Sequence, residues 1–263
     1  MENLINLFYQ IRWWFLVVTN SYSRLRVSNN KFTLAKEWDF THTDFELLDE
    51  DFRYAPPWGN KVNKRCSFKL NKRGITITSE GVTFSNITNP DDDKVETPFI
   101  SGCLVSKSNN TLPAFSKVSA MYAINRTRGN WPAFWTTDSK NVMPESDIIE
   151  FFGFKDGTSK LTPNVHYGTT YNSKKYKFHY PKNLFFPEKL SDVFMEWSAE
   201  FYPNKTIYKI NEIPVYYTTR SCSTNEKIVW LNGGTWYDAI FSDVGVSSRV
   251  KWLKYYNLKD EQK

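Results

Sequence analysis

Apolar and polar residues alternate along most of the chain, in short runs separated by turn-forming residues. Runs of this kind, rich in Val, Ile, Thr, Tyr, Phe and Trp, occupy residues 74–84, 117–124, 164–171, 175–180, 226–234 and 248–256. Sequences that favour turns, such as PPWGN, NPDDD and YPNK, lie between them. A strand places successive side chains on opposite faces of a sheet, so the pattern predicts an antiparallel β-sandwich or barrel.

One hairpin can be placed from the sequence. Residues 205–217, KTIYKINEIPVYY, are two alternating runs that meet at Asn211-Glu212, where we expect the turn. No convincing amphipathic helix is expected outside the first twenty residues. No internal repeat is visible.

The N-terminal stretch, MENLINLFYQIRWWFLVVTN, is apolar but interrupted by Gln10, Arg12 and Asn20. It fits an atypical signal or anchor, a first strand or a partner-docking arm. Its uninterrupted apolar run, Trp13–Thr19, is too short to span a membrane. The expected organisation is an appendage at residues 1–35, one domain at 36–258 and a polar tail at 259–263.

Composition narrows the function. Aromatic residues make up 17% of the chain, and such rings line sugar-binding clefts as well as cores. The net charge of +6 comes from scattered basic residues, and no nucleic-acid module is recognisable, so nucleic acid is not an expected partner. The charge leaves a basic domain or an anionic polysaccharide partner open. The three widely spaced cysteines form no metal motif or disulfide framework, although one bridge is conceivable.

The strand expected in PESDIIEFFG breaks the apolar pattern with three acids. Glu145 and Asp147 share one face, whereas Glu150, five residues from Glu145, would point the other way. One extra residue, a β-bulge at Ile148-Ile149, would bring all three acids to one face and direct Phe151 into the core.

Three carboxylates on one face repel each other, so a purely structural sheet would need Lys or Arg beside them. A glycosidase uses the repulsion: one carboxylate must be ionised while another keeps its proton near neutral pH. An acidic edge of a solvated strand is the alternative for the motif taken alone.

The order of GNWPAFW (129–135), ESDIIEFFG (145–153), NVHYG (164–168) and FMEWSAEF (194–201) resembles glycoside hydrolase family sixteen. That family includes laminarinases, agarases and carrageenases. The resemblance covers about residues 36–258 and rests most on WPAFW followed by E-x-D-x-x-E. It implies a concanavalin-A-like β-jelly-roll of two antiparallel sheets with a concave substrate cleft.

The resemblance also implies roles for individual residues. Glu145 would be the nucleophile, Asp147 its helper and Glu150 the general acid/base. The substrate-binding residues would be Trp131 and Trp135, stacking on sugar, His166 in the cleft and Trp197 beside the cleaved subsite. Trp230 and Asn232 are expected to be mainly structural.

The sequence departs from the family pattern at Ser146, at Met143-Pro144, and at Asn211-Glu212, which replaces a common Asp-Gly turn. These departures affect the substrate more than the chemistry.

The expected function is a retaining endo-glycoside hydrolase that cleaves β-1,3-glucan or a related glucan or galactan. A non-catalytic carbohydrate-binding or adhesion protein and a structural sandwich are the alternatives. No cofactor is expected, although a structural Ca²⁺ occurs in some relatives. The expected partner is a polysaccharide, neutral or, because of the net charge, anionic. We expect a monomer that is extracellular, secreted or particle-associated. Basic residues around the cleft would favour the anionic polymer; the positions to inspect are Arg126, Arg128, Lys174, Lys175 and Arg220.

Overall fold

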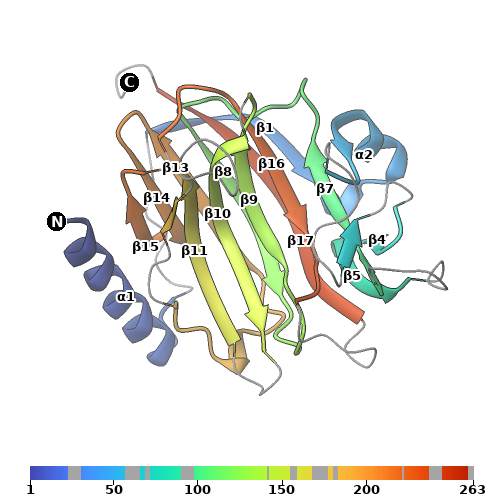
Figure 1. Ribbon diagram of the computed structural model, residues 1–263, viewed down its shortest axis with the longest axis horizontal. Helices are drawn as coiled ribbons and strands as arrows, with labels where there is room; N and C mark the ends of the chain where they lie inside the picture. The colour runs from blue at the N-terminus through green and yellow to red at the C-terminus, as the bar shows by residue number, and fades with distance from the viewer. Residues whose placement is uncertain are drawn as a thin grey trace.

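The structure is a computed structural model of the 263-residue chain (Figure 1). It describes residues 1–22, 31–56, 66–68, 72–89, 98–140, 142–154, 159–167, 177–179, 183–220, 222–236 and 245–259.

Two β-sheets lie face to face, as the alternating pattern predicts (Figure 1). The ten-stranded sheet has the order β15-β14-β13-β8-β17-β5-β6-β3, with β1 and β4 paired to β17 and β5. Its strands are β1 (Phe32–Asp39), β3 (Cys66–Phe68), β4 (Ile75–Thr78), β5 (Gly81–Thr88), β6 (Phe99–Ser101), β8 (Ser116–Ile124), β13 (Met195–Tyr202), β14 (Lys205–Ile210), β15 (Ile213–Thr218) and β17 (Gly245–Leu258). Apart from the parallel pair β3 and β6, its described pairings are antiparallel.

The seven-stranded sheet has the order β12-β11-β10-β9-β16-β7-β2 and is antiparallel throughout its described pairings. Its strands are β2 (Phe52–Arg53), β7 (Cys103–Ser106), β9 (Ala133–Asp138), β10 (Val142–Gly153), β11 (Ser159–Tyr167), β12 (Lys177–His179) and β16 (Lys227–Asn232). The expected jelly-roll sandwich is confirmed.

The helical elements are few among the described residues: α1 (Glu2–Val18), α2 (Phe45–Asp51) and the 3₁₀ turns η1 (Phe40–His42) and η2 (Glu188–Leu190). The first strand considered for the N-terminus is wrong, because residues 2–18 form α1 beside β15. The short helix α2 was not expected. Asp44 caps its N-terminus, because the Asp44 carboxylate accepts a hydrogen bond from the Leu47 N–H.

The core lies between the sheets. Its largest fully buried side chains include Trp197, Tyr122, Phe84, Phe134 and Phe151, which come from both sheets. Because side chains alternate between the two faces of a strand, the apolar residues that enter this core leave their neighbours on the outer face.

The predicted turn at Asn211-Glu212 is confirmed. Ile210 pairs with Ile213, and both turn residues have positive φ, 47° and 63°, which is the two-residue geometry that suits a twisted hairpin. Asn tolerates this conformation well at the first position, and Glu212 adopts it at the second, where the common Asp-Gly pair has glycine.

Two boundaries differ from expectation. Residues 74–84 form two strands rather than one, because the chain reverses at Ser79-Glu80 and Gly81 adopts a φ of 112°. A Cβ on Gly81 would lie 2.2 Å from the Val250 carbonyl oxygen, so the position requires glycine. The domain start expected at residue 36 falls inside β1, which pairs with β17 from Phe32 onward.

Candidate active site

The acidic strand β10 contains the predicted bulge. On the β11 side, Asp147 pairs with Asn164 while Glu150 pairs with Thr162, so three residues of β10 advance against two of β11. On the β9 side the register also slips by one residue directly after Asp147, at Ile148. The extra residue corrects the odd spacing of the acids.

Burial shows the consequence of the bulge. Ile149 and Phe151 are fully buried members of the core between the sheets, as expected of the inward face. The acids lie on the opposite face but are still largely covered: Glu145 is 7% exposed, Asp147 4% and Glu150 9%. This face of the sheet therefore holds carboxyl groups largely withdrawn from water.

His166, on β11, lies beside two of the acids. His166 is the cross-strand partner of Glu145. The His166 Nε2 lies 3.5 Å from Glu145 Oε1 and 3.4 Å from Asp147 Oδ2. The sequence-predicted histidine is therefore placed in the acidic row. When protonated, its imidazolium would favour the ionised form of both carboxyls.

Glu150 is held by two neutral donors. The Trp131 indole Nε1–H donates to Glu150 Oε1 at 3.1 Å, and the Asn164 amide donates to Oε2. Burial, followed by the charge of Asp147, raises the pKa of Glu150 from 4.5 to about 8. Burial likewise raises the pKa of Asp147 well above its usual range, against the opposing hydrogen bond from Asn164. With a pKa of about 8, Glu150 keeps its proton at neutral pH and can give it to a departing oxygen.

Aromatic rings adjoin Glu150. The Trp131 and Phe152 rings stack with centroids 6.1 Å apart, and the Trp236 ring meets both edge-on, at 5.2 Å and 4.8 Å. Phe152 follows Glu150 by two positions and so shares its face of the sheet. Such rings offer apolar faces to sugar C–H groups.

The close approach of the chain around Trp131 depends on Gly234. The Trp131 N–H donates to the Gly234 carbonyl, and a Cβ on Gly234 would lie 2.5 Å from the Trp131 carbonyl oxygen. Glycine at this position of the WLNGG segment lets the chain hold Trp131 against Glu150.

Trp135 lies opposite Asp147 across the β9–β10 pair and so faces the same side as the acids. Its ring stacks on Trp230 at 4.5 Å, and its Nε1–H donates to Asn232 Oδ1 at 2.8 Å. Trp230 itself is 1% exposed. Trp230 and Asn232 therefore support Trp135, which agrees with the structural role expected of them.

Trp197 is not at this site. It is 1% exposed, lies in the core from β13 of the ten-stranded sheet, and donates its Nε1–H to the Tyr122 carbonyl. The Trp197 side chain lies on the face of β13 that is turned toward the core, so the expected contact with a sugar subsite is wrong.

Two of the cations named for an anionic substrate have neighbours of their own. Arg126 pairs with Glu188 at 3.2 Å and donates to Ser159, and the Arg220 guanidinium lies over the Tyr167 ring. Lys174 and Lys175 lie outside the described residues.

Three of the site residues could also hold a cation. One ligand atom from each of Glu145, Asp147 and His166 lies within 4.8 Å of the others. Among the described side chains, Cys103 and Cys222 form no disulfide and belong to no such group.

Comparison with known proteins decides the family. The family model described as glycosyl hydrolases family 16 matches residues 61–252, well over half of the chain. The chain belongs to glycosyl hydrolase family 16. It is a glycoside hydrolase by family, and the expected resemblance is confirmed. A search of curated proteins finds no match.

Solved structures of the family share the fold. SCLam, a non-specific endo-β-1,3(4)-glucanase, superposes with a TM-score of 0.71 at 11% identity, over 89% of this chain and 94% of that one. LamAcat from Zobellia galactanivorans gives 0.69 at 17% identity, over 86% and 98%. The endo-β-1,3-glucanase from Pyrococcus furiosus gives 0.67 at 16% identity, over 89% and 98%.

Sequence reasoning missed Asn164, Phe152 and Trp236. The period-two rule could have found Phe152, because it shares a face with Glu150 once the bulge is accepted. Asn164 precedes His166 by two positions, so it too could have been placed on the acidic face. Trp236 carries no such signal, because it lies beyond the end of β16.

Proposed function

We propose that this family 16 glycoside hydrolase is an endo-acting, retaining β-glucanase with β-1,3-glucan as its substrate. The observation that carries the mechanism is the difference between two acids on one strand. Glu150 is buried with a pKa of about 8, whereas Glu145 lies 3.5 Å from the His166 imidazole. One acid is suited to hold a proton and the other to be ionised.

In the first step the Glu145 carboxylate attacks the anomeric carbon. The bond from that carbon to the glycosidic oxygen breaks, and the proton of Glu150 goes to the departing oxygen. Asp147 and His166 hold the Glu145 carboxylate in position for this attack. The product of this step is a glycosyl ester on Glu145.

In the second step Glu150, now ionised, takes a proton from water. The water oxygen attacks the anomeric carbon, the ester bond to Glu145 breaks, and the sugar leaves with its original configuration. These steps use carboxyl groups alone and need no metal.

Two observations favour a neutral glucan over an anionic polymer. The surroundings of Glu150 are largely aromatic, with Trp131, Phe152 and Trp236 in mutual contact, although the Lys160 ammonium lies over the Phe152 ring at 5.7 Å. Arg126, which could meet an anion, is already paired with Glu188. Among proteins of similar fold, several are named as endo-β-1,3-glucanases.

The proposal is tested by digesting laminarin and following the first product by ¹H NMR. We expect short oligosaccharides of mixed length early in the reaction, with the β-anomer formed first. The α-anomer appearing first would exclude the retaining mechanism, and single sugars released from chain ends would exclude endo action.

The substrate is tested on a panel of laminarin, agar, porphyran and carrageenan, with Glu145→Gln as the inactive control. Reducing ends released only from a sulfated galactan would overturn the glucan assignment. Binding of a polysaccharide without release from any would favour the carbohydrate-binding alternative.

A further inference from the structure

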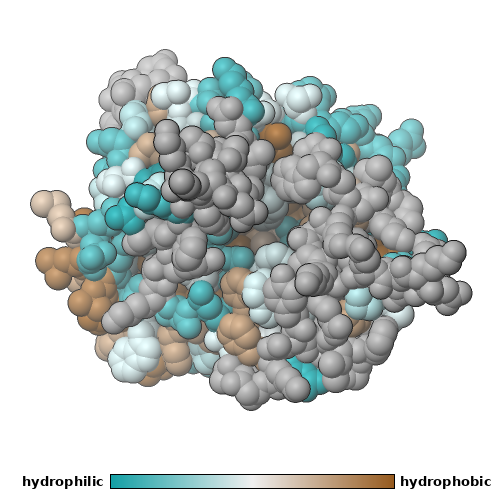
Figure 2. Space-filling view, viewed as in Figure 1, coloured by the Kyte–Doolittle hydropathy of each residue, from teal (hydrophilic) through white to brown (hydrophobic). Residues whose placement is uncertain are grey.

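The outer face of α1 is apolar and uncovered. Seven side chains at helical spacing are each between 45% and 72% exposed. We call them the α1 stripe: Leu4, Leu7, Phe8, Ile11, Trp14, Phe15 and Val18. Figure 2 shows apolar side chains gathered at the edge of the molecule where Figure 1 places α1. No charged residue interrupts the stripe.

The opposite face of α1 is bound to the domain. The Asn6 amide donates to the Tyr217 carbonyl at 2.8 Å and accepts from the Tyr217 N–H at 2.7 Å, which satisfies backbone groups of the edge strand β15. Trp13 is fully buried and donates its Nε1–H to the Phe185 carbonyl. The helix is therefore packed onto the sandwich, and the stripe has a fixed outward direction.

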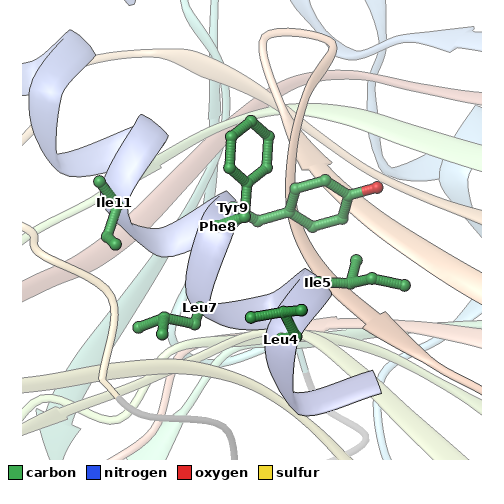
Figure 3. A pocket seen from close by; sticks show the side chains of 6 residues that line it. All are labelled: Leu4, Ile5, Leu7, Phe8, Tyr9 and Ile11. Atoms are coloured by element: carbon green, nitrogen blue, oxygen red, sulfur yellow. The ribbon is translucent and has the colours of Figure 1, made fainter. Parts of the chain in front are cut away.

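The side chains around the first turns make the same division. Figure 3 shows Ile5 and Tyr9 on the side of α1 nearer the strands, with Leu7 and Ile11 turned away from them. The domain packs against one side of α1 and leaves the other to a different environment.

The charge beside the stripe is mainly positive. Arg12 lies on α1 itself, and the Lys189 ammonium donates to the Val17 carbonyl at the helix C-terminus. The single acid of α1, Glu2, accepts a hydrogen bond from Thr219, next to the exposed Arg220. The whole chain carries a net charge of +6. An uncharged ridge flanked by cations is complementary to a surface that is apolar inside and anionic at its rim.

The helix cannot reach across a bilayer. None of the described helices is long and apolar enough to span a membrane. From Leu4 to Val18 the stripe runs about 21 Å along the helix axis, which fits a helix lying parallel to a surface. Its large exposed rings, Phe8, Trp14 and Phe15, are types that favour the boundary between headgroups and acyl chains.

We propose that α1 is an interfacial anchor that lies in the plane of an anionic lipid surface, with the α1 stripe inserted among the acyl chains. A ridge needs no matching groove in a lipid surface, whereas a protein partner would have to supply one. α1 lies at the edge of the sandwich beside β15 and not over the strands of the seven-stranded sheet (Figure 1). The inference does not depend on which sugar is cleaved.

The test is co-sedimentation of the full chain with phosphatidylcholine vesicles, with and without phosphatidylglycerol. We expect binding that is strengthened by phosphatidylglycerol and weakened, but not abolished, by salt. The double variant Phe8→Ser/Trp14→Ser should lower the partition coefficient about tenfold or more, because two large apolar side chains are lost. Leu47→Ser, at an exposed leucine of α2 with 51% exposure, should leave the partition coefficient unchanged.

Size-exclusion chromatography and circular dichroism of the same proteins complete the test, because both variants must remain folded. Absence of vesicle binding by wild type at low salt overturns the proposal. So does binding that the stripe variant retains in full. A dimer that the stripe variant dissociates, in a protein that does not bind vesicles, would assign the stripe to a second copy of the chain instead.

Discussion

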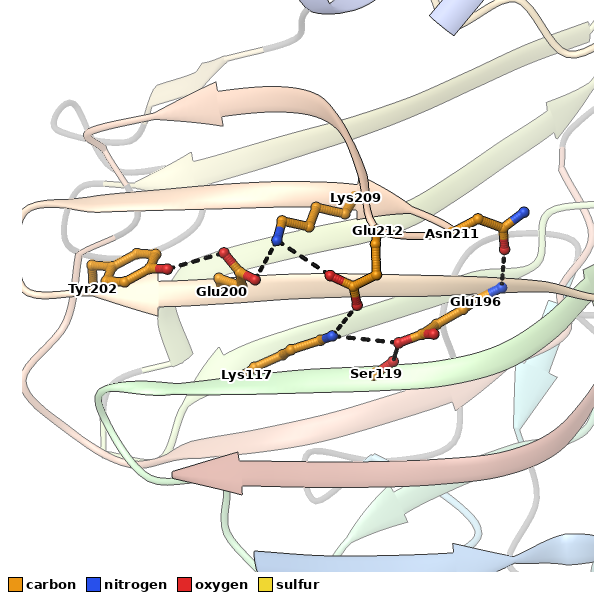
Figure 4. A network of polar contacts seen from close by, with 8 residues as sticks. All are labelled: Lys117, Ser119, Glu196, Glu200, Tyr202, Lys209, Asn211 and Glu212. Carbon is orange, nitrogen blue, oxygen red and sulfur yellow. Dashed lines mark hydrogen bonds and ion pairs between the residues drawn. The ribbon is translucent and has the colours of Figure 1, made fainter. Parts of the chain in front are cut away.

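Buried acids occur on both sheets, but in two different settings. On the outer face of the ten-stranded sheet, Figure 4 shows Glu200 and Glu212 both joined to the Lys209 ammonium, with Glu212 also joined to Lys117. Lys117 and Lys209 have side chains that are 7% and 10% exposed, so these ion pairs are largely shielded from water. We call these residues the lysine network.

The acids on β10 have neighbours of a different kind. Glu145 and Asp147 face one histidine, and Glu150 receives an indole and an amide N–H. The pKa values differ accordingly. Burial raises the pKa of Glu212, but the charges of Lys117 and Lys209 outweigh this effect, so the pKa is lowered. Burial and the charge of Asp147 instead raise that of Glu150 to about 8.

The comparison shows how the neighbours of a buried acid decide whether it keeps its proton. Ion pairing makes a buried carboxylate tolerable and keeps it ionised, which stabilises the fold but removes its use as an acid. Neutral donors hold a carboxyl in place without compensating its charge, so the proton remains available near neutral pH.

The largest expected effect separates the two settings by activity. Glu150→Gln should lower kcat/KM on laminarin about 10²- to 10⁴-fold, because the departing oxygen loses its proton donor. Glu200→Gln, the matched change in the lysine network, should leave kcat/KM within about twofold at a temperature where it is folded. Similar losses in both variants would contradict the division into catalytic and structural acids.

Glu150→Gln should also change how the free energy of unfolding depends on pH. Because the pKa of Glu150 is raised from 4.5 to about 8, the folded protein holds a proton that the unfolded chain loses at lower pH. This stabilisation is complete below about pH 4.5 and is lost as pH rises to about 8. Urea unfolding across this window should show a smaller fall in unfolding free energy for Glu150→Gln than for wild type. Equal falls would mean that the pKa of Glu150 is not raised in the folded protein.

The next effect is on stability alone. Lys117→Met removes a cation that lies 3.4 Å from Glu196 and also contacts Glu212. It should lower the free energy of unfolding by roughly 3 kcal/mol, because buried carboxylates lose their partner. Lys254→Met, at the more exposed pair with Glu37, should cost no more than about 1 kcal/mol. Denaturant unfolding measures both, and a larger loss in Lys254→Met would refute the role of burial.

The smallest effect is a shift in the pH profile. The Trp131 indole N–H favours the ionised form of Glu150, so Trp131→Phe should raise the pKa of Glu150 and move the basic limb of kcat/KM upward from about pH 8. Activity at the optimum should fall about tenfold through loss of this hydrogen bond. Trp135→Phe, whose indole donates to Asn232 instead, should leave the limb in place. A limb that moves equally in both variants would assign the shift to the aromatic packing.

The sequence by itself determined the sandwich, the hairpin turn and the acidic face of β10. These follow from local rules: a strand alternates with period two, and the five-residue spacing of Glu145 and Glu150 requires one extra residue between Asp147 and Glu150. The choice of Glu145, Asp147, Glu150 and His166 needed only that face and the family's motif.

Tertiary structure alone decided the residues whose position depends on contacts far apart in the chain. Trp197 is not one of these residues, because Met195, Ala199 and Phe201 share its face of β13 and the period-two pattern could have placed it in the core. Trp236 reaches Trp131 across about a hundred residues, and its segment has no repeating pattern to read. The same holds for the two settings of buried glutamate. The amino-acid sequence does not show whether a lysine or an indole will face each carboxyl. That contact decides which acid keeps its proton.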